Sequence, residues 1–327
     1  MSIEKKISLL DVFAESLKKV DNEIFKRLDA TLPLLAEIGT HLIKAKGKRI
    51  RPILTLAMAG QLNDFSRNPI LLATAVEFIH TATLLHDDVV DESDFRRGVK
   101  TANRIWGNEA SVLAGDFLFA QSFDLMVETN SLEALSSLSK ASCKITQGEF
   151  MQMQISNKPE TKIEDYFEVI GGKTAQLFGS ACESGVIVAN GTQEQIEAAL
   201  SYGFNIGLAF QIIDDVIDYT LEKNVSGKNI GDDFKLGKTT LPIILAWKYS
   251  DSKEKDFWIR TIKLLKQNEN DFEYAKRIMK KYNIIEECKK IAGDFINISL
   301  SSLDVFPNNK YKTPLKNLAN ESLRRKK

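Results

Sequence analysis

The spacing of hydrophobic residues is the feature that most restricts how this chain can fold. Apolar positions recur every three or four residues, as on one face of an α-helix, over residues 3–28, 69–92, 109–128, 131–156, 163–189 and 192–222. Sustained alternation of apolar and polar residues, which marks a half-buried strand, is hard to find. The pattern predicts an all-α protein, a large bundle of roughly ten or more helices around a central cavity.

The connectors between these segments are short and polar, and neither a shift in composition nor a fixed-period repeat marks a boundary. We therefore expect a single domain over residues 1–327, and the 43% hydrophobic content is ample for its core. The longest irregular stretch, 221–238, is rich in glycine and charge. A loop of that length in a compact helical protein usually has a function or is disordered.

The charge balance and the cysteine content limit which binding partners and which cellular compartment are expected for this chain. Lysine plus arginine (44) equals aspartate plus glutamate (44), so no overall field attracts nucleic acid. The basic end, Arg324 to Lys327, is expected to be solvated rather than to contact anionic lipid. Three scattered cysteines suit a reducing cytoplasm. We expect neither a signal peptide nor a membrane span, since no apolar stretch of ~18 residues stands out.

Two clusters of aspartates point to a metal site. Each ends an apolar helical segment and has the spacing i, i+1, i+4; the members are Asp87, Asp88, Asp91, Asp214, Asp215 and Asp218. Residues four apart share a helix face, so the carboxylates of a cluster repel one another unless a cation offsets them. Oxygen ligands favour Mg²⁺, or Mn²⁺, over zinc. Few carboxylates per ion leave positions for water and substrate phosphates.

A different metal site is suggested by Glu77-x-x-His80, the ligand pair of di-iron carboxylate bundles. That chemistry needs two such pairs, and neither His41 nor His86 has a glutamate three residues before it. We therefore disfavour di-iron. A satisfied core histidine is the other ordinary role for His80.

Several separate cationic groups accompany the carboxylates. They are Lys48, Arg49 and Arg51 in GKRIRP, Arg96 and Arg97 after the first cluster, Lys173 in GGKT, and Lys228 and Lys238 near the second cluster. Arginine grips diphosphates with two-pronged geometry and lysine as a point charge. Together with magnesium-type carboxylates, these cations predict two polyanionic substrates, one held through metal and one by basic residues alone.

The order of these motifs resembles that of a known family. GKRIRP, FIHTATLLHDDVVDESDFRRG, GGKTA, FQIIDDVID and GDDFKLGKTTLP follow one another between Gly47 and Pro242 as in the trans-isoprenyl diphosphate synthases (polyprenyl synthetases), and the long-chain type is the most similar. The resemblance implies the isoprenoid synthase type I fold and a homodimer. It also implies Mg²⁺-dependent, head-to-tail condensation of isopentenyl diphosphate with an allylic diphosphate such as farnesyl diphosphate.

The resemblance also implies a role for each matching residue. The six aspartates would hold the Mg²⁺ ions that bridge the allylic diphosphate. The other ligands of that diphosphate would be Arg96, Lys173, Thr174, Gln211, Lys228 and Lys238. Isopentenyl diphosphate would be bound without metal by Lys48, Arg51, His80 and Arg97. Catalysis would depend on Asp87, Asp88, Asp91, Arg96, Lys173, Asp214, Asp215 and Lys238.

In the implied mechanism, metal and cations stabilise charge on the departing diphosphate while the allylic C–O bond ionises. A closed, dry pocket protects the resulting cation from water. The double bond of isopentenyl diphosphate attacks, and the released diphosphate takes the proton. One position departs from many relatives, which have a carboxylate where this chain has Gln152.

Small side chains before the first cluster predict a long product. Ala82 and Thr83 lie about one helical turn before Asp87, where short-chain members of the family place an aromatic floor. An open passage there would allow about six to ten isoprene units, the length of a quinone tail. Phe150 and Met151 are candidates for the true floor. The alternative is that the small residues only allow close helix packing.

Other functions stay open beside the long-chain synthase. They are a shorter-chain (geranylgeranyl or farnesyl) diphosphate synthase, a terpene cyclase of the same bundle type, and a non-catalytic partner subunit. Cyclases usually carry an altered second metal motif, and partner subunits typically lose one acidic cluster, whereas this chain has both clusters and GKRIRP. A peripheral membrane contact for product release is also left open, although no anchor is visible.

Overall fold

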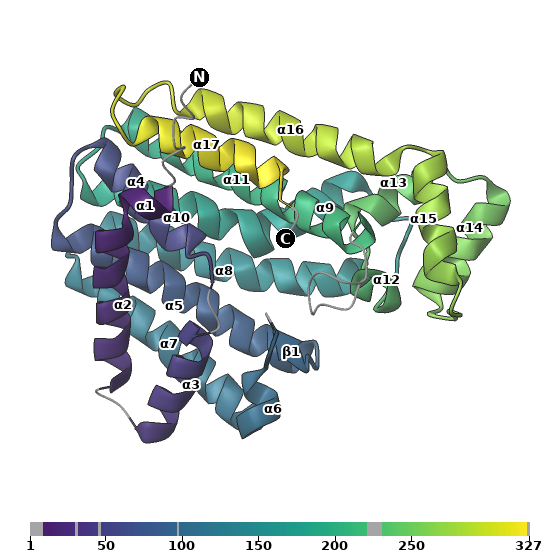
Figure 1. Cartoon of the computed structure of the whole chain (residues 1–327), viewed down its shortest axis with the longest axis horizontal. Coiled ribbons are helices and arrows are strands. Elements are labelled where there is room, and N and C mark those ends of the chain that lie inside the picture. The colour runs from purple at the N-terminus through teal and green to yellow at the C-terminus, as the bar shows by residue number, and fades with distance from the viewer. Residues whose placement is uncertain (1–8, 30–31, 45–46, 97, 221–230, 326–327) are drawn as a thin grey trace, which may run out of the picture. The chain divides into compact units, whose positions relative to one another are not determined.

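Helices make up nearly all of the regular structure (Figure 1). The computed structural model describes residues 9–29, 32–44, 47–96, 98–220 and 231–325. The helices are α1 (Leu9–Val12), α2 (Ala14–Asp29), α3 (Pro33–Lys44), α4 (Ile50–Gln61), α5 (Arg67–Val90), α6 (Ala102–Trp106), α7 (Asn108–Glu128), α8 (Leu132–Ile155), α9 (Ile163–Ile170), α10 (Gln176–Val188), α11 (Gln193–Thr220), α12 (Asp232–Lys235), α13 (Leu241–Tyr249), α14 (Ser252–Trp258), α15 (Asp271–Lys281), α16 (Ile284–Ser302) and α17 (Lys312–Leu323). Two π-helical turns are η1 (Gly171–Ala175) and η2 (Ile259–Lys263), and β1 (Phe95–Arg96) pairs with β2 (Val99–Lys100) in an antiparallel hairpin.

The chain divides into two compact units. The first unit comprises Met1–Ser142, Leu177–Gly203 and Ser302–Leu318. The second unit comprises Cys143–Gln176, Phe204–Ser301 and Ala319–Lys327. Helices α8, α11 and α17 each supply a segment to both units. The single domain expected over residues 1–327 stays a prediction, because compact units need not fold independently.

In the first unit, α5 is the central helix. It packs along α7 and also against α4 and α2 (Figure 1). Leu72, Val76 and Leu85 of α5 are fully buried, which explains why this helix is apolar on more than one face. Gly185 of α10 allows a close approach to α4, since a Cβ there would lie 2.3 Å from the carbonyl oxygen of Thr55.

In the second unit, Trp258 is the largest fully buried side chain. Its indole N–H donates to the hydroxyl of Ser250 at 2.9 Å, so the one polar atom of the ring is satisfied in the core. Asp251 and Glu254 form a capping box that starts α14, with Asp251 accepting from the Glu254 N–H at 3.0 Å. These contacts fix where α14 begins beside α13.

The helices confirm the predicted all-α class and most predicted segments. GGKT, which breaks the apolar spacing, forms the π-helical turn η1 between α9 and α10. The β1–β2 hairpin was not predicted, because two-residue strands are too short to show alternation. Within the irregular stretch 221–238, residues 221–230 lie outside the described residues, and α12 follows.

Three described helices, α5, α7 and α11, are long and apolar enough to cross a membrane on length and composition alone. The expectation that no stretch reaches that length is therefore wrong. Burial inside the protein accounts for much of the apolar character of these helices. In the apolar 18-residue stretches of α5, α7 and α11, the buried share is 67%, 39% and 61%, respectively. Helix α7 is the least covered of the three.

Candidate functional site

The first aspartate cluster lies at the C-terminal end of α5, in the first unit. Asp87 and Asp88 belong to its last turn, and Asp91 is the residue that caps it. Asp88 is only 1% exposed and accepts a hydrogen bond from Nε of Arg96 at 2.8 Å. Burial raises the pKa of Asp88, Arg96 opposes that rise, and the charges of Asp87 and Asp91 add to it. One arginine therefore does not balance the local negative charge.

The helix end itself adds to the demand for a cation. Carbonyl groups in the last turn of a helix carry partial negative charge, so carboxylates there are less favourable than at the N-terminal end. Nδ2 of Asn103 donates to the backbone carbonyl of Asp88 at 3.1 Å and satisfies one of these groups. The β1–β2 hairpin returns the chain so that Arg96 reaches the carboxylate of Asp88.

Arg49, one of the three cations in GKRIRP, has a structural role. Its backbone is left-handed (φ 50°) just before α4 begins. Its guanidinium pairs with Glu77 on α5 and, at 3.5 Å, with Asp21 on α2. Glu77 is 7% exposed, so an arginine already neutralises this buried carboxylate. That pairing gives Glu77 a role other than the iron ligand of a Glu-x-x-His site.

A small cavity in the first unit collects several predicted residues. His80, Asp88 and Arg96 line it together, and its volume of about 30 Å³ is room for one or two water molecules. Its other lining residues are His41, Leu42, Gly47, Arg49, Glu77, Thr81, Leu84, Val99, Lys100, Thr101 and Ala102.

The two remaining cations predicted to bind isopentenyl diphosphate lie at the start of α4. Lys48 is exposed in the segment before this helix. Arg51 stacks on the ring of Phe178 from α10, with 4.3 Å between the guanidinium carbon and the ring centroid. The ring restricts where this guanidinium can point.

The second aspartate cluster lies at the C-terminal end of α11, in the second unit. Asp215 is 4% exposed, and both of its oxygens accept hydrogen bonds. The Tyr166 hydroxyl donates to one at 2.7 Å, and Nε2 of Gln211 donates to the other at 2.8 Å. The hydroxyl of Thr174, in GGKT, donates to Oε1 of Gln211 at 2.9 Å. A predicted metal ligand and two predicted diphosphate ligands thus form one network.

Carboxylates crowd this end of α11. Burial raises the pKa of Asp215 well above its ordinary value, and the charges of Asp233 and Asp214 raise it further, against the effect of its hydrogen bonds. Asp233 belongs to α12, and its N–H donates to Oδ2 of Asp218 at 3.2 Å. A hard cation would relieve this repulsion better than the neutral donors do.

Sequence reasoning missed two residues of this network. Tyr166 lies eight positions before Thr174, and no pattern connects it with the aspartates. Asp233 stands in the quoted motif GDDFKLGK, where an acidic pair after glycine was an available signal. Lys238 in the same motif is partly buried, and its N–H donates to the carbonyl of Asp233 at 2.9 Å.

The GGKT turn is held against α8 by glycines. A Cβ on Gly148 would lie 2.4 Å from the backbone nitrogen of Lys173, and one on Gly172 would lie 2.8 Å from the carbonyl oxygen of Lys144. Nζ of Lys173 pairs with the carboxylate of Glu149 at 2.7 Å. A π-helical turn often marks a functional site. Here the turn places Lys173 beside the carboxylate of Glu149. A phosphate group would compete with that carboxylate for the lysine.

The other predicted residues are placed as follows. Arg97 and Lys228 lie outside the described residues. Ala82 is 1% exposed, and Thr83 is half-buried and donates from its hydroxyl to the carbonyl of His80 at 2.8 Å. Neither lines the small cavity of the first unit.

The residues of α8 named in the sequence analysis differ in exposure. Phe150 is 63% exposed. Met151 and Gln152 are partly buried. The position of a floor for the product stays a prediction.

The donor set of the two clusters fits a hard divalent cation. The six aspartates offer only oxygen, and Asp88 and Asp215 are buried carboxylates with neighbouring negative charge. Over the described ranges, no three or more histidine, cysteine, aspartate or glutamate side chains are gathered closely enough to hold an ion as they stand. The metal-binding role of the aspartates therefore stays a prediction.

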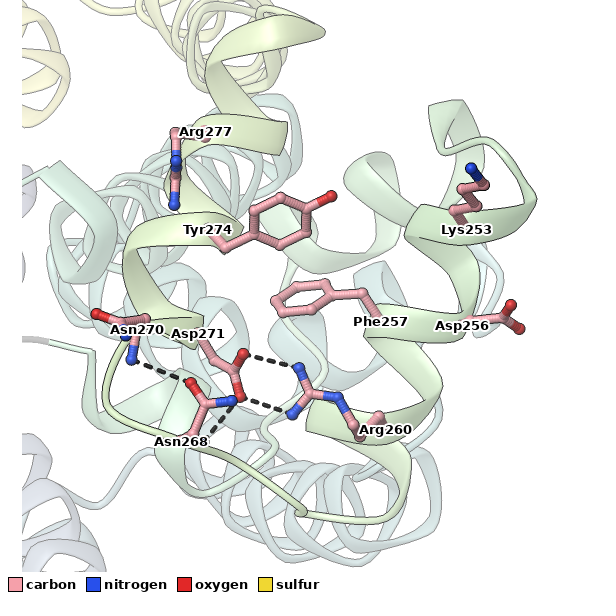
Figure 2. Close-up of a pocket in the computed structure, with 9 residues that line it drawn as sticks. All are labelled: Lys253, Asp256, Phe257, Arg260, Asn268, Asn270, Asp271, Tyr274 and Arg277. Atoms are coloured by element: carbon pink, nitrogen blue, oxygen red, sulfur yellow. Dashed lines mark hydrogen bonds and ion pairs between the residues drawn. The ribbon is translucent and has the colours of Figure 1, made fainter.

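A larger cavity, of about 620 Å³, lies elsewhere in the second unit, beside α14, η2 and α15 (Figure 2). None of the predicted site residues lines it. Arg260 and Asp271 form two hydrogen bonds of 2.7 Å there, and the rings of Phe257 and Tyr274 meet edge to face. The arginine and the aspartate neutralise each other, so the pair joins η2 to α15.

Comparisons with a family model and with known proteins point to the same family. Residues 32–279 match the family model described as polyprenyl synthetase. An octaprenyl diphosphate synthase from Haemophilus influenzae is 38% identical over 319 residues, which cover 98% of this chain and 96% of that protein.

Solved structures agree with this match. A decaprenyl diphosphate synthase from Rhodobacter capsulatus has a TM-score of 0.93 at 40% identity and covers 98% of both chains. A polyprenyl synthase from Caulobacter crescentus, solved with calcium and isoprenyl diphosphate, has a TM-score of 0.93 at 41% identity and covers 98% of this chain and 97% of that one. The predicted isoprenoid synthase fold is confirmed.

Proposed function

Because the chain belongs to the polyprenyl synthetase family and is a trans-prenyl diphosphate synthase, we propose that it makes a long-chain, all-trans polyprenyl diphosphate. The reaction is Mg²⁺-dependent, head-to-tail addition of isopentenyl diphosphate to an allylic diphosphate such as farnesyl diphosphate. The product has about six to ten isoprene units and serves quinone side chains. The network from Thr174 through Gln211 to Asp215 supports the diphosphate synthase part of the proposal, and the small side chain of Ala82 supports the long product. A terpene cyclase usually has an altered second metal motif.

The acidic and basic side chains have different tasks in this proposal. The aspartates hold Mg²⁺, which stabilises the charge that develops on a departing diphosphate. Arg96 and Lys173 are paired with Asp88 and Glu149, respectively, and exchange those carboxylates for phosphate oxygens. Such an exchange costs less than bringing in an unpaired arginine or lysine, because both cations are already partly desolvated.

The second substrate is bound by basic residues alone. These residues are Lys48, Arg51, His80 and Arg97. Its double bond attacks the allylic cation to form the new carbon–carbon bond, and the proton then lost goes to the released diphosphate. Water has to be excluded from the cation, since hydrolysis would end chain growth.

Incubation with farnesyl and labelled isopentenyl diphosphates plus Mg²⁺ tests the function. We expect chain extension that a chelator abolishes and that Asp214→Ala lowers by about 100-fold or more. A cyclase would release hydrocarbon without consuming isopentenyl diphosphate. A non-catalytic subunit would do neither. Either of these results would contradict the proposal.

Product length is tested at Ala82. We expect Ala82→Tyr to shorten the product to about the geranylgeranyl length, because a ring then blocks the passage before Asp87. Ala82 is 1% exposed, so the ring also has to displace core neighbours, and thermal unfolding must show that the variant folds. Ala82→Ser is the matched control and keeps the long product. Unchanged product sizes on thin-layer chromatography for a folded Ala82→Tyr would refute the role of this position.

We further propose a cytoplasmic homodimer with peripheral membrane contact during product release. Support comes from α7, on which Val112, Leu113 and Val127 are 38%, 58% and 59% exposed. At about 100° per residue these three positions fall on one face of the helix, which also carries the exposed Glu109 and Asp116. Exposed apolar side chains grouped on one face are often covered by a partner.

A further inference from the structure

The end of α17 brings an arginine to the second aspartate cluster. Arg325 lies two residues beyond the helix and belongs to the second unit, as do Phe210 and Asp214. Its guanidinium carbon lies 3.7 Å from the centroid of the Phe210 ring, and Nη2 lies 3.8 Å from Oδ1 of Asp214. The side chain is 16% exposed, so the expectation of a solvated end is wrong for Arg325. The neighbouring Arg324 is exposed, as expected.

The donors of Arg325 are only partly used. Nε and Nη1 are buried and have no hydrogen-bond partner among the described residues. The contact with Asp214, at 3.8 Å, is longer than a hydrogen bond. A stack on an aromatic ring holds a guanidinium in place but leaves its in-plane N–H groups without acceptors. Burial of such groups is unfavourable unless something accepts their hydrogen bonds.

An acceptor at this place has to arrive with positive charge, because Asp214 repels an anion on its own. A further carboxylate of the chain would bring none and would add to the negative charge of Asp214, Asp215 and Asp218. A diphosphate carries several oxygens that match the two-pronged donor pattern of arginine. In the proposed reaction, a diphosphate reaches this cluster together with the cation that Asp214 helps to hold.

We propose that Arg325 binds the diphosphate of the allylic substrate at the second aspartate cluster. The inference rests on the proposed function, because that function brings a diphosphate to Asp214. Arg325 then adds a donor, two residues beyond α17, to the part of the site that η1 and α11 supply in the second unit. Phe210 holds the guanidinium in advance, so little side-chain freedom is lost on binding.

Calorimetric titration of the full chain with inorganic pyrophosphate, at saturating Mg²⁺, tests the proposal without turnover. We expect Arg325→Gln to weaken pyrophosphate binding by about 10- to 100-fold, the range for hydrogen bonds to a charged group. Arg325→Lys keeps the charge but loses the two-pronged geometry, so about a three- to tenfold loss is expected. The matched control is Arg324→Gln, one residue away and exposed, for which binding stays within about twofold.

Steady-state kinetics give an independent readout. Arg325→Gln is expected to raise KM for farnesyl diphosphate while KM for isopentenyl diphosphate changes little. Pyrophosphate affinity equal to wild type in Arg325→Gln overturns the inference, and so does an equal loss in Arg324→Gln. If Arg325→Gln does not fold, wild-type affinity in Arg325→Lys overturns it instead. Failure of the wild-type chain to extend farnesyl diphosphate counts against the proposed function alone, because the titration does not depend on turnover.

Discussion

The hydroxyl group of Tyr166 is one of two donors, with Nε2 of Gln211, that position the buried carboxylate of Asp215. Tyr166 donates to Asp215 at 2.7 Å, and Tyr166→Phe removes this bond while keeping the ring. We expect the Mg²⁺ concentration for half-maximal activity to rise about tenfold, the usual cost of losing a residue that orients a metal ligand. The measurement is a Mg²⁺ titration of the initial rate. Tyr249→Phe, at an exposed position bonded to Glu287, is the control and should leave the titration unchanged. An unaltered requirement in Tyr166→Phe would show that the bond does not matter for metal.

For single residues, the sequence indicates candidate site residues, but it does not show which side chains they contact in the folded chain. Spacing predicted the two aspartate clusters, because i, i+4 neighbours are a local property of a helix. It could not predict that Arg49 pairs with Glu77, because these residues lie 28 positions apart and meet only when α4 and α5 have packed. The same holds for Arg325, whose contacts with Phe210 and Asp214 depend on where α17 ends.

The close crossing of α8 and η1 requires glycine at position 148, which has no side chain. A Cβ on Gly148 would lie 2.4 Å from the backbone nitrogen of Lys173, and backbone cannot move aside as a flexible side chain can. We expect Gly148→Ala to lower the free energy of unfolding by about 1–3 kcal/mol and to raise KM for the allylic diphosphate, because Lys173 shifts. Urea unfolding and steady-state kinetics measure the two effects.

Gly293 on α16 is the control for this prediction. A Cβ there meets nothing within 4 Å. Gly293→Ala should therefore stabilise the protein by up to about 1 kcal/mol through helix propensity, without a change in KM. Equal effects of the two substitutions would contradict the proposed role of the crossing.

The Arg260–Asp271 pair, which joins η2 to α15, should make the stability of the protein depend on pH in a known direction. The hydrogen bonds from Arg260 hold the pKa of Asp271 below its ordinary value. The stabilisation is therefore fully present above the unfolded-state pKa of about 3.9 and is lost as the pH falls through the folded-state value. We expect Arg260→Gln to cost about 1–2 kcal/mol at pH 7 and much less near pH 3, measured by urea unfolding. The same loss at both pH values would rule out this pair as the cause.

At the scale of elements, the periodic segments named up to residue 222 were predicted well, whereas α16 (Ile284–Ser302) and the shortest elements were not. Residues 109–128 were predicted helical and α7 spans Asn108–Glu128, because many turns of the pattern support one another. The β1–β2 hairpin has two residues in each strand, too few for any period. Yet this hairpin carries Arg96 to Asp88, so the position of a predicted diphosphate ligand depends on an element that spacing cannot reveal.

The face of α7 that carries Val112, Leu113 and Val127 is expected to be the contact between two copies of the chain. Leu113 is 58% exposed on this face, and Leu113→Glu should convert a dimer to a monomer, measured by light scattering after gel filtration. Leu264→Glu, at a leucine of the second unit with 55% exposure, is the matched control and should leave the dimer intact. A monomeric wild-type protein would contradict the prediction, as would a Leu113→Glu dimer that had lost only its binding to lipid vesicles.

For the whole molecule, the sequence predicted the fold class and the family, since both depend on pattern and on motifs that are local in the chain. Product length depends on which side chains meet at the end of a passage, and that is a matter of tertiary packing. Ala82 illustrates the difference, because its size is read from the sequence whereas its burial at 1% is not.

The buried carboxylates at the ends of α5 and α11 also affect how the protein folds. Asp88 and Asp215 are desolvated among like charges, so each opposes the folded state as long as no cation is bound. An ion that binds only the native chain adds RT ln(1 + [ion]/Kd) to its stability. If the aspartates hold Mg²⁺ as proposed, the ion would also act as a folding ligand, and magnesium starvation would reduce the amount of protein that survives proteolysis.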